Sequence, residues 1–248
     1  MSAVPVSAFD RLATNYDEVW THSHAGRLQR EAVWRHLDPL IHAGDRILDL
    51  GCGTGEDALH FSLKRANVVA IDSSPMMVEA ARGKGVDARA MSVEDIASLE
   101  GTFDQIVSNF GALSCVRDLS VLGEPLQRLV RPGGHLAICL MSRFCLRESL
   151  YYFARGRFGK AARRWRGEAS ASIGLRVFYP SSKQVQRALS PNFRLVVDVG
   201  IGVCVPPSFV RGVSPTLLTR LGRIDARIDA SRIGRSIGDH RLLVFSRI

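Results

Sequence analysis

The chain has 248 residues, of which 46% are hydrophobic and 23% are charged. This apolar fraction is enough for a real core and excludes wholesale disorder. The sequence also contains no apolar run of about 18 residues, so we expect no membrane-spanning helix.

The formal net charge of +9 is divided unevenly along the chain. Residues 1–142 hold 13 basic and 18 acidic residues, a net charge of −5, whereas residues 143–248 hold 20 and 6, a net charge of +14. A basic protein invites a nucleic-acid interpretation, but no recognised DNA- or RNA-binding appendage is present, so we do not favour it.

The N-terminus carries acidic residues early and lacks the basic and apolar regions of a signal peptide, so we expect a cytoplasmic protein. The number of cysteines is odd and none has CxxC spacing, which indicates neither a disulfide framework nor a zinc site. The cysteines are Cys52, Cys115, Cys139, Cys145 and Cys204.

Helical patterns over residues 9–20 and 26–41 open the chain, and strands alternating with helices follow. The predicted strands are Arg46–Leu50, Val68–Ile71, Val86–Met91, Phe103–Ser108 and His135–Met141. The predicted helices are Glu56–Lys64, one that starts at Pro75 with Ser74 as its cap, and Leu119–Leu129. Arg131–Gly134 is expected to act as a breaker before the fifth strand. This alternation predicts an α/β fold with a parallel sheet.

After Met141 the rhythm changes. Phe144–Arg166 has a helical pattern interrupted at Gly156 and Gly159, and Ser181–Leu189 predicts another helix. Phe193–Val199 and Arg241–Ser246 are strand-like, with a proline-containing and then arginine-rich segment between them. No linker separates two independent domains.

The most informative segment is Asp49–Glu56, DLGCGTGE, which follows a predicted strand and opens a predicted helix. Its glycines allow a sharp turn and close approach of a ligand to free N–H groups. The nicotinamide fingerprint needs a glycine at the position of Glu56, and no Walker-type Gly-Lys-Ser/Thr follows. The loop carries two carboxylates and no basic residue, which favours a ligand with a positive amino group over a phosphate ligand.

Asp72 ends the second predicted strand, 17 residues after Gly55. A carboxylate there can accept hydrogen bonds from both hydroxyls of a ribose. A glycine cluster alone is often a turn, and an aspartate at a strand end is often a helix cap. Their order and spacing together predict a ligand site.

The motif from Asp49 to Gly55 resembles the first motif of class I S-adenosylmethionine (SAM)-dependent methyltransferases. The resemblance runs from about Phe9 to Met141 and includes the strand at Arg241–Ser246. Small-molecule methyltransferases of quinone biosynthesis are the most similar subgroup. Further matches to them are Phe9-Asp10, Tyr16-Asp17, the fourth strand with the residues after it (FDQIVSNFGAL) and Arg131–Gly134.

The resemblance implies a doubly wound, mostly parallel, seven-stranded Rossmann-like sheet with N-terminal lid helices and an insertion between strands five and six. We expect a single methyltransferase domain. Its parts are the lid helices (1–43), the SAM-binding core (44–142), a substrate-recognition insertion (143–192) and the closing strands (193–248).

The resemblance also implies how SAM is held. The loop from Gly51 through Cys52 and Gly53 to Gly55 would cradle its methionine part, with Asp49 near the amino group and Asp72 on the ribose. The remaining contacts fall to Ser73 and Met77 beside the adenine, Ser92, Val93 and Glu94 at its edge, Asn109 and Phe110 facing the methyl group, Tyr16 as a cover, and Arg27 or Arg30 on the carboxylate. Met77 and Phe110 also suit an ordinary core, and the family often has Asp at the position of Ser92.

Methyl transfer from a sulfonium needs positioning more than chemistry from the protein, so no metal is expected. A general base is needed only for a protonated acceptor. The available bases are His22 and His24 in the lid segment, His135 at the start of a strand, and His240, which is placed in a hairpin before the last strand. The candidates for a catalytic role are His22, His24, Asn109 and Tyr151.

The candidates for binding the acceptor are Arg147, Tyr151, Tyr152 and Arg155. The basic cluster from Arg155 to Arg166 leaves three interpretations open: recognition of an anionic group on a small substrate, contact with nucleic acid or an anionic membrane, or a solvated helix face. Its other members are Arg157, Lys160, Arg163 and Arg164.

The sequence therefore predicts methyl transfer from SAM to an O, N or C atom of a small acceptor, one that is anionic, lipid-like or aromatic. Two alternatives stay open: SAM-dependent cyclisation or aminocarboxypropyl transfer in the same pocket, and a basic binding module on a degenerate scaffold. The oligomeric state is not specified by the sequence.

Overall fold

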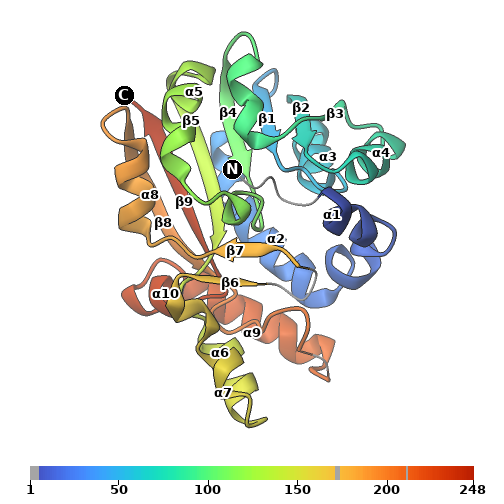
Figure 1. Ribbon diagram of the computed structural model, residues 1–248, viewed down its shortest axis with the longest axis vertical. Coiled ribbons are helices and arrows are strands. Elements are labelled where there is room, and N and C mark those ends of the chain that lie inside the picture. The colour runs from blue at the N-terminus through green and yellow to red at the C-terminus, as the bar shows by residue number, and fades with distance from the viewer. Residues whose placement is uncertain (1–5, 171–173, 211) are drawn as a thin grey trace.

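The computed structural model describes residues 6–170, 174–210 and 212–248, built around a seven-stranded sheet (Figure 1). The strand order is β3-β2-β1-β4-β5-β9-β8. These strands are β1 (Arg46–Leu50), β2 (Asn67–Asp72), β3 (Ala88–Ala90), β4 (Phe103–Ser108), β5 (Val130–Met141), β8 (Phe193–Ile201) and β9 (His240–Arg247).

Neighbouring strands from β3 to β5 are parallel, and β9 pairs antiparallel with both β5 and β8. The predicted α/β class with a mostly parallel seven-stranded sheet is confirmed. Leu50 pairs with Ile71, and Asp49 pairs with Val107. The glycine loop, Asp72 and Asn109 therefore meet at one edge of the sheet, where the parallel strands end.

Helices cover both faces of this sheet. Alternate residues of β1 enter different apolar clusters, as expected for a strand buried on both sides. Leu48 shares a cluster with Leu126 and Val185, whereas Ile47 shares one with Val33 and Phe61. The covering elements are α2 (His24–Leu37), α3 (Glu56–Leu63), α4 (Pro75–Gly83), η3 (Val93–Ser98), η5 (Leu119–Leu122), α5 (Gly123–Leu129) and α8 (Ser182–Leu189).

Three predicted helical patterns are divided in the structure. Residues 9–20 belong to α1 (Val6–Ala13) and a π-helical turn, η1 (Asp17–Thr21). Leu119–Leu129 is a 3-10 turn followed by α5. Phe144–Arg166 forms α6 (Leu146–Phe153), α7 (Phe158–Ala161) and the 3-10 turn η6 (Arg163–Arg166), because Gly156 adopts a left-handed conformation at φ +68° between the first two.

Two helices and a strand pair escaped prediction. The proline-containing and arginine-rich segment forms α9 (Pro215–Ile228) and α10 (Arg232–Ile237), capped by Ser214 and Ser231. The ribbon of β6 (Glu168–Ser170) and β7 (Arg176–Phe178) lies between the sheet and α6 (Figure 1). A Ser-Pro pair begins α9 as it begins α4, but the arginines of α9 interrupt the apolar pattern that would have predicted a helix.

Two local predictions about the last strands were wrong. Arg131–Gly134 does not end an element: it lies within β5, at a bulge where the register with β4 shifts between Phe103 and Gln105. His240 does not lie in a hairpin but begins β9, buried and paired with Met141 and Ile201.

A buried ionic network joins the segment after β5 to the sheet. Arg164, only 3% exposed, donates to Glu148 Oε2 at 2.6 Å and to Asp239 Oδ1 at 2.7 Å. Arg163 donates to Glu148 Oε1 at 2.8 Å, and Gln29 of α2 donates to Asp239 Oδ2 at 3.2 Å. Burial opposes ionisation of Asp239, but His240 and Arg164 outweigh it, so the pKa of Asp239 lies below its usual value.

In the part of the chain that the structure describes, no helix combines the length and the apolar character needed to cross a membrane.

We predict that Arg164→Met lowers the free energy of unfolding by about 3–5 kcal/mol, because it leaves two buried carboxylates without their shared cation. Arg163→Met is the matched control, since its side chain is 26% exposed and Glu148 keeps Arg164 as a partner. Its expected cost is roughly 1–2 kcal/mol. Urea unfolding of both variants measures the difference, and equal losses would contradict the network's role.

Candidate functional site

The glycine loop is held against the end of β2 by its own backbone. Gly51 N and Cys52 N both donate to Ile71 O, at 2.8 and 2.9 Å, and Gly53 N donates to Asp72 Oδ2 at 2.9 Å. Gly51, Gly53 and Gly55 all have positive φ, at 74°, 54° and 82°. The loop therefore needs glycine at three positions for its backbone alone.

The three glycines differ in what surrounds them. A Cβ on Gly51 would lie 2.1 Å from the Ala112 Cβ, and one on Gly55 would lie 2.9 Å from the Ala81 Cβ. A Cβ on Gly53 would meet no atom within 4 Å. Gly51 and Gly55 thus serve packing within the protein, and Gly53 borders space that a ligand can enter.

Two carboxyl groups flank the loop, and they differ in how many hydrogen bonds they accept. Asp49 is 1% exposed, and its Oδ2 has no hydrogen-bond partner among the described residues. Burial, helped by the charge of Asp57, raises the pKa of Asp49 well above its usual value. Asp72 accepts from Ser74 N at 2.9 Å and from Gly53 N at 2.9 Å, and burial raises its pKa against these two bonds.

The N-terminal helices are fastened over the loop by acidic residues. Asp10 accepts from the Ser74 hydroxyl at 2.5 Å. Asp17 accepts from the Thr54 hydroxyl at 2.5 Å and from Lys84 at 2.6 Å. Burial would raise the pKa of Asp17, but these two bonds outweigh it and lower the pKa.

Arg30 of α2 reaches the start of α3. It forms a buried ion pair with Asp57, which also accepts from Trp34 Nε1 at 2.7 Å and from Asn109 Nδ2 at 3.2 Å. The guanidinium lies 4.7 Å from the ring centre of Trp20, and its Nε is buried without a partner among the described residues. The loop motif, which has no basic residue of its own, therefore receives a cation from α2.

Phe110 adopts φ +48°, a left-handed conformation that is strained for an aromatic residue. Its N–H donates to Asn109 Oδ1 at 3.0 Å. The ring meets Trp20 edge-on at 4.7 Å between centroids and His240 at 5.2 Å. His240, which sequence reasoning placed in a hairpin, is therefore part of this site.

Tyr16 precedes η1 and packs against Trp20, with ring centroids 5.8 Å apart. Burial raises the pKa of Tyr16 to about 12, although the charge of Arg30 opposes this. The hydroxyl therefore stays protonated at neutral pH.

The residues expected at the adenine lie along the ends of β2 and β3. Met77 is buried in α4, and Ser73 is half-buried beside Asp72. Ser92 caps η3, where its hydroxyl bonds the Glu94 carboxylate, and Val93 packs against the apolar core. Ser92 is thus already engaged by a neighbour.

The candidate bases and acceptor residues are spread more widely. His22 is exposed, and His24 Nε2 lies 3.0 Å from the Thr219 hydroxyl of α9. His135 lies partly buried in β5. Across the described ranges, no group of three or more His, Cys, Asp or Glu side chains is arranged to hold a metal ion.

The four acceptor candidates lie on α6 or, for Arg155, just after it, and not at the loop. Tyr151 and Tyr152 pack against Phe209, and the Arg155 guanidinium lies 3.6 Å from the centre of the Tyr151 ring. Arg147 lies near Cys204, whose pKa is raised by burial and by the charge of Asp225 although the charge of Arg147 opposes this. Among the described residues, no hydrogen bond, ion pair or ring contact joins these four to the glycine loop.

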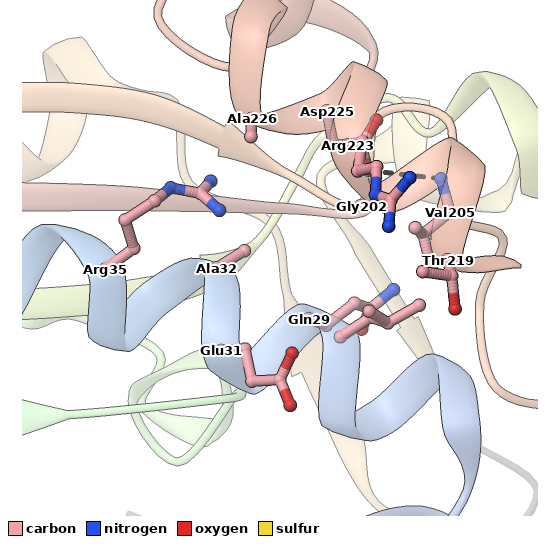
Figure 2. Close-up of a pocket in the computed structure, with 12 residues that line it drawn as sticks. Gln29, Glu31, Ala32, Arg35, Gly202, Val205, Thr219, Arg223, Asp225 and Ala226 are labelled. Carbon is pink, nitrogen blue, oxygen red and sulfur yellow. Dashed lines mark hydrogen bonds between the residues drawn. The ribbon is translucent and has the colours of Figure 1, made fainter.

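A cavity of about 260 Å³ lies between α2 and α9 (Figure 2). Gln29 and Arg35 line it from α2, and Arg223 lines it from α9. Asp225 accepts from Cys204 N at 2.6 Å and Val205 N at 3.1 Å, which fixes the opposite wall. This cavity could not be foreseen, because α9 was not predicted.

A family model described as a methyltransferase domain matches residues 22–193. The demethylmenaquinone methyltransferase of Clavibacter sepedonicus is 35% identical over 141 residues, which cover 54% of this chain and 56% of the relative. The chain thus matches little more than half the length of that relative.

Solved structures agree with the sheet topology. An S-adenosylmethionine-dependent methyltransferase of Mesorhizobium loti has a TM-score of 0.59 at 19% identity, over 87% of this chain and 97% of that one. The 1,6-didemethyltoxoflavin-N1-methyltransferase of Burkholderia thailandensis, solved with 1,6-didemethyltoxoflavin and S-adenosylhomocysteine, has a TM-score of 0.56 at 17% identity, over 98% and 86%. At these identities the likeness shows the fold, and it confirms the Rossmann-like architecture that the motifs imply.

We predict that Asp17→Ala loosens the N-terminal helices, because it removes their bonds to Thr54 and Lys84. Amide hydrogen exchange over residues 6–21 should speed up by about tenfold, while exchange in β1 and β4 stays unchanged. Glu18→Ala is the control, since Glu18 is exposed and has no partner among the described residues. Equal exchange in the two variants would show that Asp17 does not fasten this segment.

Proposed function

The chain belongs to the methyltransferase-domain family, and we propose that it transfers the methyl group of SAM to an oxygen, nitrogen or carbon atom of a small-molecule acceptor. The observation that carries the proposal is the buried Asp49 carboxylate beside the glycine loop. A buried carboxylate oxygen without a partner is costly, and the ammonium group of an amino-acid ligand would satisfy it.

The remaining groups at the site fit the parts of SAM. Gly53 borders open space next to Asp72, whose two oxygens each hold one backbone N–H and keep lone pairs for ribose hydroxyls. Arg30 Nε is buried and free to donate to a carboxylate. Ser73, Met77, Ser92, Val93 and Glu94 would flank the adenine.

When bound, SAM supplies a methyl group on a positively charged sulfur, which a nucleophile displaces in line. The protein's part is to fix the direction of approach and exclude water. Trp20 and Phe110 would form the wall at this point, with Tyr16 behind Trp20. Asn109 holds the Phe110 backbone through Oδ1 and bonds Asp57 through Nδ2.

A protonated acceptor would also need a base. Burial lowers the pKa of His240 despite the opposing charge of Asp239, which favours the neutral imidazole that a base requires. Its contact with Phe110 places it ahead of the candidates His22, His24 and Tyr151 for this role.

We further propose that the acceptor is a small anionic, lipid-like or aromatic molecule. The relatives are named for demethylmenaquinone and 1,6-didemethyltoxoflavin, which are both small molecules. The basic excess lies in residues 143–248. In this proposal residues 1–43 cover the cofactor, 44–142 hold it, 143–192 face the acceptor and 193–248 close the sheet.

We predict that Asp72→Ala weakens the binding of SAM and of S-adenosylhomocysteine by about 1–3 kcal/mol, because both ribose hydroxyl contacts are lost. Titration calorimetry on the pure protein measures both affinities. Asp87→Ala is the matched control, since Asp87 is an exposed carboxylate whose one ion-pair partner within the described ranges is Arg89. The proposed function fails if the wild-type protein binds neither molecule.

We predict that SAM affinity rises as the pH increases above the usual titration range of an aspartate side chain. The raised pKa keeps Asp49 protonated in the free protein, and the ligand's ammonium group favours the carboxylate, so binding releases a proton. Calorimetry in buffers of different ionisation enthalpy counts that proton. Asp49→Asn should bind more weakly and without this pH dependence, and an identical pH dependence in the variant would assign the proton to another group.

A further inference from the structure

A basic cavity of about 370 Å³ lies among α7, η6 and β6. We use the name basic cavity for the space lined by Tyr152, Lys160, Arg163, Arg166 and Glu168. It is formed by the cluster whose role the sequence left open, and it is separate from the glycine loop and from the cavity between α2 and α9.

The cationic groups of this cavity outweigh its acidic one. Lys160 and Arg166 have no carboxylate partner within the described ranges of the chain, and both are exposed to solvent. Glu168, the one acidic lining residue, pairs at 2.7 Å with Arg176, which does not line the cavity. The charges of Lys160 and Arg166 are thus left for a ligand.

The third cation of the cavity, Arg163, is fixed by a buried carboxylate. Arg163 Nε donates to Glu148, which is 2% exposed and is also bound by Arg164. The Ser149 hydroxyl donates to Ala161 O at 2.9 Å, which ties α7 to α6. A guanidinium fixed in this way loses little freedom when an anion arrives.

Two of these cations lie close to the Tyr152 ring. Lys160 Nζ lies 5.8 Å from its centre and the Arg163 guanidinium lies 5.7 Å from it. The ring itself stacks on Phe209, with centroids 5.8 Å apart. Lys160 and Arg163 therefore converge on one wall, unlike the divergent charges of a solvated helix face.

From this arrangement we infer that the basic cavity binds a phosphate group. A phosphate carries up to two negative charges and several acceptor oxygens, which suits two guanidinium groups and an ammonium group better than a single carboxylate does. The inference does not depend on the proposed methyl transfer, since binding here needs neither SAM nor the glycine loop.

The phosphate can belong to a free ligand or to a lipid headgroup. Phe153 follows Tyr152 in the chain, and Phe158 lies two residues before Lys160. Their rings meet edge-on at 5.2 Å between centroids, and the two residues are 63% and 61% exposed. An apolar group attached to the phosphate could pack against these two rings. Both sources share the phosphate chemistry, so the experiment has one arm for each.

The test compares wild-type protein with Lys160→Ala/Arg166→Ala, whose two side chains are exposed and leave the buried network intact. One arm titrates inorganic phosphate and pyrophosphate by calorimetry at low ionic strength, and the other measures cosedimentation with phosphatidylglycerol and phosphatidylcholine vesicles. We expect the double variant to lose about tenfold or more in affinity in whichever arm shows binding. The matched control is Lys183→Ala/Arg187→Ala, which removes the same charges from exposed positions on α8.

Saturable binding of phosphate or pyrophosphate that the double variant loses and the control keeps supports a free ligand. The same pattern with phosphatidylglycerol vesicles alone supports a lipid headgroup. No binding in either arm, or equal losses in the two double variants, would overturn the inference. SAM affinity measured on the same samples reports on the proposed function separately.

Discussion

Buried carboxylates at the edge where the parallel strands end impose the constraint on which much of this structure depends. Asp49 lies in β1 just before the glycine loop and Asp57 lies in α3 just after it, so these two elements place carboxyl groups where there is little water. Each such charge needs a cation or a proton. Arg30 of α2 forms an ion pair with Asp57, whereas Asp49 has no such partner and its pKa is raised. The same lack of cations next to the loop explains two features. It explains why α2 packs there with Arg30, and why the site suits a ligand with a positive charge.

Local signals explain what the sequence predicted well. The strands Arg46–Leu50 and Phe103–Ser108 are short apolar runs with sharp ends, and the Ser74-Pro75 pair is a cap that needs no distant partner. The loop, Asp72 and Asn109 could be placed together because parallel neighbours bring their ends to one edge. The α9 helix was missed because arginines on its exposed face dilute an apolar stripe that only its packing against α2 reveals.

Partners distant in sequence account for what could not be predicted. Arg164 lies in a run of basic residues, and nothing local marks it as the one that meets Glu148 and Asp239, the latter 75 residues away. His240 gave no sign of its contact with Phe110, since that contact depends on the position of β9 beside β5. The basic cluster therefore has no single role: part of it is structural and buried, and part lines a cavity.

The peptide unit between Asp239 and His240 carries a consequence of its own. Asp239 accepts a hydrogen bond from Arg164 of the segment after β5, and the His240 ring contacts the Phe110 ring. These two neighbours face different parts of the molecule but share one short, inextensible length of backbone at the start of a strand. The position of η6 and the position of the aromatic wall beside the glycine loop are therefore both tied to a single peptide unit.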